Sequence, residues 1–332
     1  MPDENPLPKV QADFANKIKF RSLPSEMCDI GSALNRICFS DIGATLDSPP
    51  FARAIVEGFL VNTDETKTAD ESSPVSFKIA GEILPGDANA IAPQKGEAIQ
   101  ISTGSIIPDG DYSAVRMWEA KQENNNILVT RPFPPRFFIE EQGCDIKKDD
   151  ILLPAGTLVT AAHIGTLASM GIKEIPVTKK AQVAVFSSGD EVIPYTDTFK
   201  PGSIFDCNLP MLSAAVENSG GHAISCGIQS DNFEAFVDAA KKALSNADML
   251  LISGGTAVGG RDFISDLIKE LGELIVDGVP MRSGRPLIMG IADDKPIVCV
   301  AGYPPEALRG FTLFGQLAMN ILSGHSKELP TD

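Results

Sequence analysis

The sequence predicts a multidomain α/β protein in which one domain is doubly wound. Three observations support this prediction. The chain has 332 residues, which is more than a single hydrophobic core usually holds. Residues 48–134 consist of short alternating apolar runs separated by Pro, Gly and Asp, which is typical of β-strands and turns. From Ala181 onward, near-continuous apolar runs alternate with segments of helical period, which favours a parallel sheet with helices on both faces.

The C-terminal half, residues 181–326, supplies the strands and helices of the doubly wound domain. The predicted strands are "AQVAVFSSG" from Ala181, "HAISCGI" from His222, "DMLLIS" from Asp248 and "PIVCVAG" from Pro296. The predicted helices cover residues 209–219, 232–247, 263–272 and 304–322. In such sheets, ligands bind at the C-terminal ends of the strands.

The N-terminal half is expected to combine helical and β structure. Residues 16–47 are predicted to be helical, with Ser25 as the N-cap. The apolar face of this segment would carry Met27, Ile30, Leu34 and Ile37. Helix and turn return over residues 135–180, where a helix is expected to end at Gly171. Residues 48–134 form the predicted β domain between them.

Composition excludes several classes of protein. With 43% hydrophobic and 22% charged residues, the chain matches a folded protein in water and not a disordered one. No apolar run is long enough to span a bilayer and the N-terminus lacks a signal-type core, so the protein is expected to be cytoplasmic. A formal charge of −16 argues against nucleic acid and anionic membranes as partners. The six scattered cysteines and three histidines indicate reduced thiols, not a zinc site.

Three predicted strands end in turns of glycine and other small residues. "SSGDE" begins at Ser187, "SGGTAVGG" at Ser253 and "AGYPPEA" at Ala301. Glycine at a strand end lets a ligand approach the backbone, and a following helix offers free N–H groups to an anion. The pattern fits neither a Walker A loop nor the dinucleotide fingerprint. One such turn is more often only a turn, but three on one sheet edge favour a ligand that carries a phosphate.

A basic pair lies in the segment "VDGVPMRSGRPLIMG", where Arg282 and Arg285 flank a Ser-Gly turn. Two planar guanidinium groups suit forked binding of phosphate or another oxyanion. A surface hairpin with two solvated arginines is the alternative. In so acidic a chain, a basic pair beside glycine turns favours the anion site.

Carboxylates also gather at the predicted strand ends. They are Asp190, Glu191, Asp206, Asp231 and Asp262. Carboxylates that converge beside a phosphate commonly hold Mg²⁺, which keeps several waters and shares phosphate oxygens. Taken singly, each also fits an N-cap or loop position. Asp262 directly precedes a predicted helix and fits an N-cap well.

Nine short motifs occur along the chain in a fixed order. In the C-terminal half these are "SSGDEVIP", "SIFDCN", "SGGTAVGGRDF", "MRSGRPL" and "AGYPPEA". Upstream they are "PPFARAIVEGFLV", "GEILPGD", "ISTGSIIPDG" and "DILLPAGTLVTAAHIGTLASMGI". Together they resemble the MoeA-type molybdopterin molybdenumtransferases, the family of the gephyrin C-terminal domain. The resemblance extends from about residue 20 to residue 325, and an ordered series of this length is specific.

The resemblance implies a homodimer whose subunit has three domains. Residues 16–47 and 135–180 would form an elongated mixed domain, residues 48–134 a β domain, and residues 181–326 a molybdopterin-binding α/β domain. Family members take adenylylated molybdopterin and molybdate, cleave the adenylate with Mg²⁺ and yield the molybdenum cofactor. The implied protein partners are a molybdoenzyme or an upstream adenylyltransferase.

The resemblance also assigns residues to this reaction. Thr103 and Ser105 would lie near a molybdate pocket contributed by the β domain. Glu191, Asp231 and Asp262 would be the acidic catalytic residues, with Asp231 and Asp262 as ligands of Mg²⁺. The other predicted ligand-binding residues are Ser187, Gly189, Ser253, Gly254, Gly255, Gly259, Arg282, Arg285 and Gly302. The two arginines stand where the family has lysines.

Several positions depart from the family pattern. The family's "PPFDRSAMDGYAV" is "PPFARAIVEGFLV" here, so Ala52 replaces an Asp and cannot handle a metal ion or a proton. The basic "RRRGED" is "EEQGCD", and Glu140 and Glu141 are expected to repel an anion. Trp118 stands where Gln is usual and is expected to pack in the core. The chain ends at Asp332, where family members usually continue into a further β domain.

Two functions follow from these observations. The first is molybdenum transfer to molybdopterin within molybdenum cofactor biosynthesis, with release of AMP. The alternative is a catalytically weakened paralogue that binds molybdopterin as a carrier or scaffold. The glycine turns with Asp231 and Asp262 favour the first, whereas Ala52 and the acidic pair at 140 and 141 favour the second. Insertion of tungstate in place of molybdate is chemically adjacent and cannot be recognised in the sequence.

Overall fold

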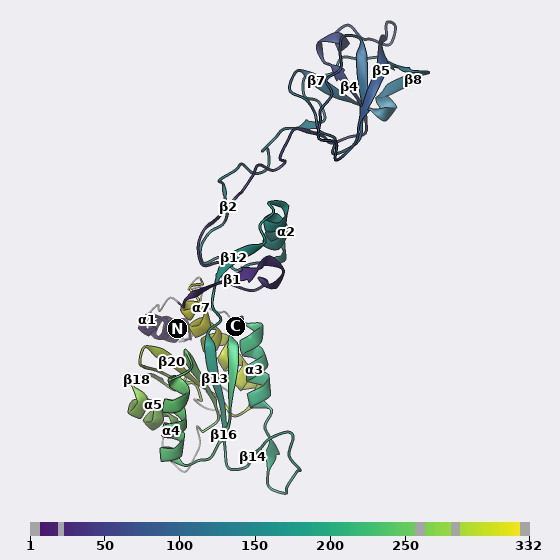
Figure 1. Cartoon of the computed structure of the whole chain (residues 1–332). Helices are drawn as coiled ribbons and strands as arrows, with labels where there is room; N and C mark the ends of the chain where they lie inside the picture. The colour runs from purple at the N-terminus through teal and green to yellow at the C-terminus, as the bar shows by residue number, and fades with distance from the viewer. Residues whose placement is uncertain (1–6, 19–22, 256–262, 280–285, 326–332) are drawn as a thin grey trace, which may run out of the picture. The chain divides into compact units, whose positions relative to one another are not determined.

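The chain folds as two compact units. The computed structural model describes residues 7–18, 23–255, 263–279 and 286–325 (Figure 1). One unit consists of residues 1–41, 153–164 and 173–332, and the other of residues 42–152 and 165–172. We call them the first and the second unit. The division into three domains remains a prediction from the sequence.

The first unit is built on a six-stranded sheet with the strand order β16-β13-β17-β20-β19-β18. Its strands are β13 (Gln182–Ser188), β16 (His222–Gln229), β17 (Met249–Ser253), β18 (Glu273–Asp277), β19 (Ile288–Ala292) and β20 (Lys295–Val300). β16, β13, β17 and β20 are parallel, but β18 and β19 are antiparallel to their neighbours. The predicted parallel sheet is therefore antiparallel at this edge. The reason is a two-residue hairpin turn at Asp293 and Asp294, both with positive φ, which joins β19 directly to β20.

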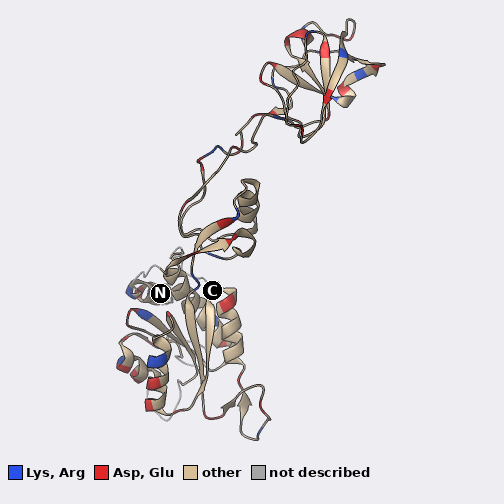
Figure 2. Cartoon of the chain, viewed as in Figure 1, with Lys and Arg blue, Asp and Glu red and all other residues tan. Residues whose placement is uncertain are grey.

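Helices cover both faces of this sheet, as the sequence predicts (Figure 1). One face is covered by α1 (Leu7–Lys17), α3 (Asn208–Asn218), α6 (Pro304–Gly310) and α7 (Gln316–Leu322). The other is covered by α4 (Phe233–Leu244) and α5 (Phe263–Leu271). Side chains along β13 alternate between the faces, so that Val183 and Val185 join the first core and Ala184 and Phe186 the second. Strands β16, β13 and β17 contain no Asp, Glu, Lys or Arg, whereas such residues lie on helices around the sheet (Figure 2).

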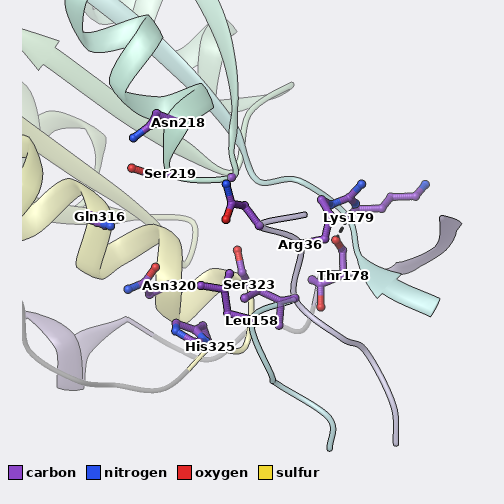
Figure 3. Close-up of a pocket in the computed structure, with 13 residues that line it drawn as sticks. Arg36, Leu158, Thr178, Lys179, Asn218, Ser219, Gln316, Asn320, Ser323 and His325 are labelled. Carbon is purple, nitrogen blue, oxygen red and sulfur yellow. Dashed lines mark hydrogen bonds between the residues drawn. The ribbon is translucent and has the colours of Figure 1, made fainter. Parts of the chain in front are cut away.

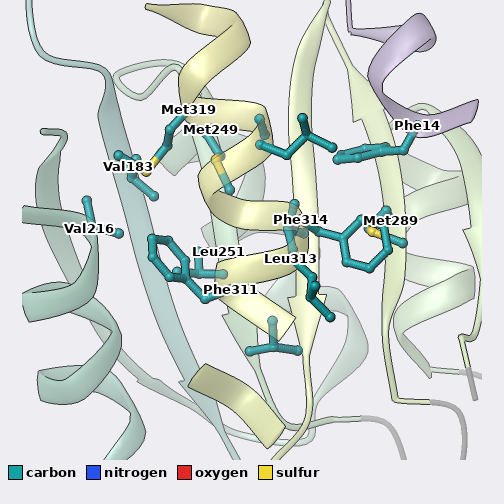
Figure 4. Packing of buried hydrophobic residues seen from close by; sticks show 14 of the residues in the cluster. Phe14, Val183, Val216, Met249, Leu251, Met289, Phe311, Leu313, Phe314 and Met319 are labelled. Carbon is teal, nitrogen blue, oxygen red and sulfur yellow. The ribbon is translucent and has the colours of Figure 1, made fainter. Parts of the chain in front are cut away.

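The larger core brings segments from both ends of the chain together (Figure 4). Phe14 of α1 is fully buried, and its ring meets that of Phe314 edge-on at a centroid distance of 6.2 Å. Phe314 belongs to a π-helical turn, Phe311–Gly315, that links α6 to α7. The sequence did not predict α1. None of the helices in the described residues is long and apolar enough to cross a membrane.

The predicted helix over residues 16–47 is wrong. Residues Ser25–Asp29 form strand β1, which pairs antiparallel with β12 (Glu174–Thr178), and Ile30–Ser32 form a short 3₁₀ turn, η1. The apolar residues at helical spacing do not share a buried face, since Met27 is 61% and Leu34 52% exposed. The helix predicted to end at Gly171 is present as α2 (Ala161–Ser169), and Gly171 follows it with a φ of 69°.

The second unit confirms the β structure predicted for residues 48–134. Its main sheet has the order β7-β4-β6-β5-β9-β8. These strands are β4 (Gly58–Asn62), β5 (Val75–Ile83), β6 (Glu97–Ile101), β7 (Tyr112–Arg116), β8 (Ala120–Glu123) and β9 (Asn126–Val129). Two short pairs join β2 (Ile42–Gly43) to β11 (Ile151–Leu153) and β3 (Arg53–Ala54) to β10 (Ile139–Glu140). Two 3₁₀ turns, η2 (Asp64–Thr66) and η3 (Met117–Glu119), complete the unit.

Candidate functional site

A cleft of 680 Å³ lies in the first unit, at the C-terminal ends of β13, β17 and β20. Its walls come from those strand ends, from β15 (Ile204–Phe205), from the start of α3 and from the start of α6. This is the sheet edge at which parallel α/β sheets bind their ligands. The volume is within the range of about 300–1,000 Å³ that is typical of small-molecule sites.

The turn after β17 exposes backbone to the cleft. Gly254 and Gly255 have φ values of 92° and 73°, a conformation that side chains disfavour. A Cβ at Gly254 would lie only 2.9 Å from the carbonyl oxygen of Ser188. Among the described residues, the N–H of Gly255 has no hydrogen-bond partner. The turn therefore offers a ligand a close approach and a free donor, which suits an anion.

A buried side-chain amide joins this turn to the end of β20. The Nδ2 of Asn208 donates to Ser253 Oγ at 2.8 Å and to the carbonyl oxygen of Gly302 at 2.8 Å. Ser253 Oγ in turn donates to the carbonyl oxygen of Ala301 at 3.2 Å. Asn208 is 9% and Ser253 2% exposed, so water competes little for these bonds. One side chain thus fixes two of the three glycine turns.

Asp206 fixes Asn208 in turn. Its Oδ1 accepts hydrogen bonds from the backbone N–H groups of Asn208 and Leu209, both at 3.0 Å, and so caps the start of α3. The same oxygen accepts from Ser187 Oγ at 3.0 Å, which ties the end of β13 to the helix. Asp206 is 5% exposed, and its Oδ2 is buried without a partner in the described residues.

Three carboxylates approach one another beside this network. Asp190 Oδ1 accepts from the backbone N–H of Asp231 at 3.2 Å, and Asp231 and Glu191 both line the cleft. Oδ1 of Asp231 is buried without a partner in the described residues. Burial, followed by the charges of Asp190 and Glu191, raises the pKa of Asp231. Carboxylate oxygens are the donors that Mg²⁺ prefers.

In the second unit, Thr103 and Ser105 lie in one tight loop but differ in access. Thr103 is exposed. Ser105 is fully buried, and its hydroxyl donates to the carbonyl oxygen of Ile83 at 2.7 Å and accepts from the N–H of Ser102 at 3.1 Å. The Ser105 hydroxyl thus holds the loop together, so that only Thr103 presents a side chain for a ligand.

The acidic pair of the second unit is engaged by arginines. Arg53 Nε donates to Glu140 Oε2 at 2.6 Å, across the short pair β3–β10. Arg136 binds both carboxylate oxygens of Glu141, at 2.5 and 2.9 Å. The hydrogen bond from Arg136 lowers the pKa of Glu141. Glu140 and Glu141 are therefore not the unpaired charges from which repulsion of an anion was expected, because an arginine balances each of them. The guanidinium of Arg53 is in turn occupied by Glu140.

The comparisons with known proteins agree with this geometry. A family described as the MoeA N-terminal region (domain I and II) matches residues 7–171, and a probable molybdopterin binding domain matches residues 184–320. A molybdopterin molybdenumtransferase of Nostoc sp. is 31% identical over 97% of this chain and 76% of its own length. This chain belongs to the molybdopterin molybdenumtransferase family.

Other members of the family extend the comparison. The molybdopterin molybdenumtransferase of Staphylococcus epidermidis is 29% identical over 89% of this chain and 71% of its own length. Two solved structures of molybdopterin biosynthesis MoeA proteins from Pyrococcus horikoshii match with TM-scores of 0.80 and 0.83, at 32% and 26% identity. They cover 96% and 97% of this chain, which covers 80% of each.

The structure brings most of the site residues predicted from the family pattern into one cleft. Those that line it are Ser187, Gly189, Glu191, Asp231, Ser253, Gly254, Gly255 and Gly302. Gly259, Asp262, Arg282 and Arg285 lie outside the described residues, so their roles remain predictions. The hydroxyls of Ser187 and Ser253 are taken up by the Asp206–Asn208 network, which makes them supports of the cleft walls.

Sequence reasoning missed Asn208 and misplaced Trp118. Asn208 stands in the quoted motif "SIFDCN", and its place after a strand-end aspartate is the one available signal. Trp118, expected in the core, is 73% exposed, so that prediction is wrong. The guanidinium of Arg116 lies 4.9 Å from the centre of its ring. The 3₁₀ turn Met117–Glu119 directs the indole away from the core.

The raised pKa of Asp231 leads to a prediction about stability. The folded protein holds the Asp231 proton more tightly than the unfolded chain does. The resulting stability is fully present below the unfolded pKa of about 3.9 and is lost as the pH rises through the folded pKa. The variant Asp231→Asn should therefore have a larger free energy of unfolding than the wild type at pH 7 and an equal one near pH 3.

Urea unfolding in magnesium-free buffer at the two pH values measures this difference. Asp238→Asn, an exposed position on α4, is the matched control and should show no gain at pH 7. A loss of stability at pH 7 in Asp231→Asn would mean that its carboxylate already has a stabilising partner in the folded protein.

Proposed function

We propose that this chain is a molybdopterin molybdenumtransferase of molybdenum cofactor biosynthesis. It would bind adenylylated molybdopterin in the 680 Å³ cleft, release AMP and transfer molybdate to the pterin. One observation supports this most. The same cleft contains a backbone N–H, that of Gly255, and a carboxylate oxygen, that of Asp231, neither of which has a hydrogen-bond partner among the described residues. The names of the related proteins indicate molybdopterin as the substrate. Its adenylylated form is what the family resemblance implies, and the cleft has groups that suit its phosphates.

The glycine turn is proposed to hold a phosphate. Backbone N–H groups bind phosphate oxygens without adding a side-chain charge. Gly254 and Gly255, both with positive φ, line the cleft. Because Asn208 anchors Ser253 on one side of the turn, the donor is held in place before the ligand arrives. This rigidity lowers the entropic cost of binding.

The carboxylates are proposed to hold Mg²⁺. Asp231, with its buried unpartnered oxygen and raised pKa, fits the ion best, and Asp190 and Glu191 are close enough to raise that pKa by their charges. Asp262, outside the described residues, is the second ligand expected from the family. When bound, the ion would neutralise charge on the phosphate oxygens. Glu191 is then the carboxylate available to accept the proton of the attacking water as the anhydride bond breaks and AMP leaves.

Molybdate is proposed as the second substrate. The second unit offers few free groups that could bind it. Thr103 is the exposed residue of the predicted pocket, Ala52 offers no carboxylate, and Arg53 is paired with Glu140. This pairing favours the second candidate function, a paralogue that binds molybdopterin but inserts metal weakly. A homodimer, an upstream adenylyltransferase as donor and a molybdoenzyme as acceptor remain part of the proposal.

Release of AMP tests the first function. The protein incubated with adenylylated molybdopterin, molybdate and Mg²⁺ should release AMP, and Asp231→Asn should lower this rate by at least about a hundredfold. Since the same substitution is expected to stabilise the fold, loss of activity would not reflect unfolding. Asp238→Asn should retain the wild-type rate. Release of AMP at the wild-type rate by Asp231→Asn would show that Asp231 is not a catalytic residue.

Freeing Arg53 tests the choice between the two functions. In Glu140→Gln, the guanidinium of Arg53 loses its ionic partner and becomes available to molybdate. We expect insertion of molybdenum, measured as active cofactor delivered to a molybdoenzyme, to rise about tenfold while AMP release stays unchanged. Glu141→Gln, which removes the ionic partner of Arg136 instead, is the matched control. A wild-type protein that already delivers cofactor as fast as it releases AMP would contradict the weakened-paralogue function.

A further inference from the structure

A second cavity, of 340 Å³, lies in the first unit at the edge of the sheet opposite the cleft (Figure 3). Asn218 and Gly220, at the end of α3, line it just before β16 begins at His222. Lys179 lines it just before β13 begins at Gln182. The cavity therefore adjoins the N-terminal ends of parallel strands, and it shares no residue with the cleft.

Four amide side chains line the cavity, and no acidic side chain does. None of its 13 lining residues is Asp or Glu, in a chain that has 44 of them. Four of the lining residues are Asn35, Asn218, Gln316 and Asn320. Within the described part of the chain, none of these four side-chain amides makes a hydrogen bond. The cavity thus presents several free donors and acceptors that carry no charge.

Helix α7 supplies a stripe of such groups. Gln316, Asn320 and Ser323 follow one another at helical spacing, so they share one face of the helix. Leu317 and Ile321 point into the hydrophobic core on its other side. From residue 311 to residue 323 the sequence contains no charged residue. A helix face in water usually carries charges, and this uncharged polar stripe suits contact with a neutral polar ligand.

Of the lysine and arginine side chains that line the cavity, Arg36 is paired and Lys179 is exposed to solvent. The guanidinium of Arg36 forms an ion pair with Glu26 and donates to the carbonyl oxygen of Thr178 at 2.9 Å, so its charge is balanced and its position is fixed. Figure 3 shows Arg36 and Lys179 on one side of the cavity and Gln316 and Asn320 across from them. Leu158 adds an apolar surface to the wall.

We propose that this cavity binds a neutral nucleoside. The side-chain amides of Asn and Gln offer the paired donor and acceptor that match the edge of a purine base, above all adenine. Leu158 and Ile37 provide an apolar surface for the face of the base, and the remaining amides suit the ribose hydroxyls. The volume falls within the range of known small-molecule sites. This site is independent of the function proposed for the cleft.

The three histidines of the chain allow a site-specific test. Of these, His325 lines the cavity, whereas His163 and His222 do not. Adenosine titrated to about 10 mM into the full chain should shift the imidazole NMR signals of His325 and leave those of the other two unchanged. The variant His325→Gln assigns the signal. Absence of any His325 shift would overturn the proposal.

Substitution of the amides tests whether adenosine binds in this cavity and not elsewhere on the chain. Gln316→Leu combined with Asn320→Leu should weaken adenosine binding at least about tenfold, whereas Asn246→Leu, an exposed amide after α4, should not change it. Equal affinity in the double variant would overturn the proposal, and so would a loss of binding in Glu191→Gln, because adenosine would then occupy the cleft. His325 signals that move on dilution without nucleoside would assign the cavity to a second copy of the chain and equally overturn it.

Discussion

The geometry of the cleft depends on one buried side-chain amide. Asn208 donates both of its N–H groups, one to Ser253 after β17 and one to Gly302 after β20. Asp206 holds Asn208 by capping α3 and reaches Ser187 at the end of β13. Three strand ends and one helix start are thus joined through two side chains. In a buried setting each of these bonds is strong, and leaving one unmade would cost about 1–3 kcal/mol.

The carboxylates of the two units have different neighbours. In the first unit the carboxylates of Asp190, Glu191 and Asp231 remain close together, and the charges of the first two raise the pKa of Asp231. That arrangement suits a cation shared with a phosphate. In the second unit Glu140 is matched by Arg53, which balances its charge and occupies the arginine. The same acidic composition thus leaves carboxylates without a basic partner in the first unit and pairs them with arginine in the second.

The sequence predicts those parts of the site that depend on neighbouring residues, and not those that depend on distant ones. The strand at Met249–Ser253 and its glycine turn are evident because the apolar run and the glycines are consecutive. Asn208 is not evident, since its partners lie 45 and 94 residues away in the chain. Likewise, Ser25–Asp29 has the spacing of a helix but forms a strand, because pairing with Glu174–Thr178 decides its conformation.

The affinity of the Asn208→Ala variant for adenylylated molybdopterin tests the central claim most directly. Calorimetry at saturating Mg²⁺ would compare this variant with the wild type and with Asn246→Ala, an exposed amide outside the cleft. If Asn208 holds the glycine turns in their binding conformation, its loss should weaken binding at least about tenfold while circular dichroism shows the fold intact. An unchanged affinity in a folded Asn208→Ala protein would contradict this role of Asn208.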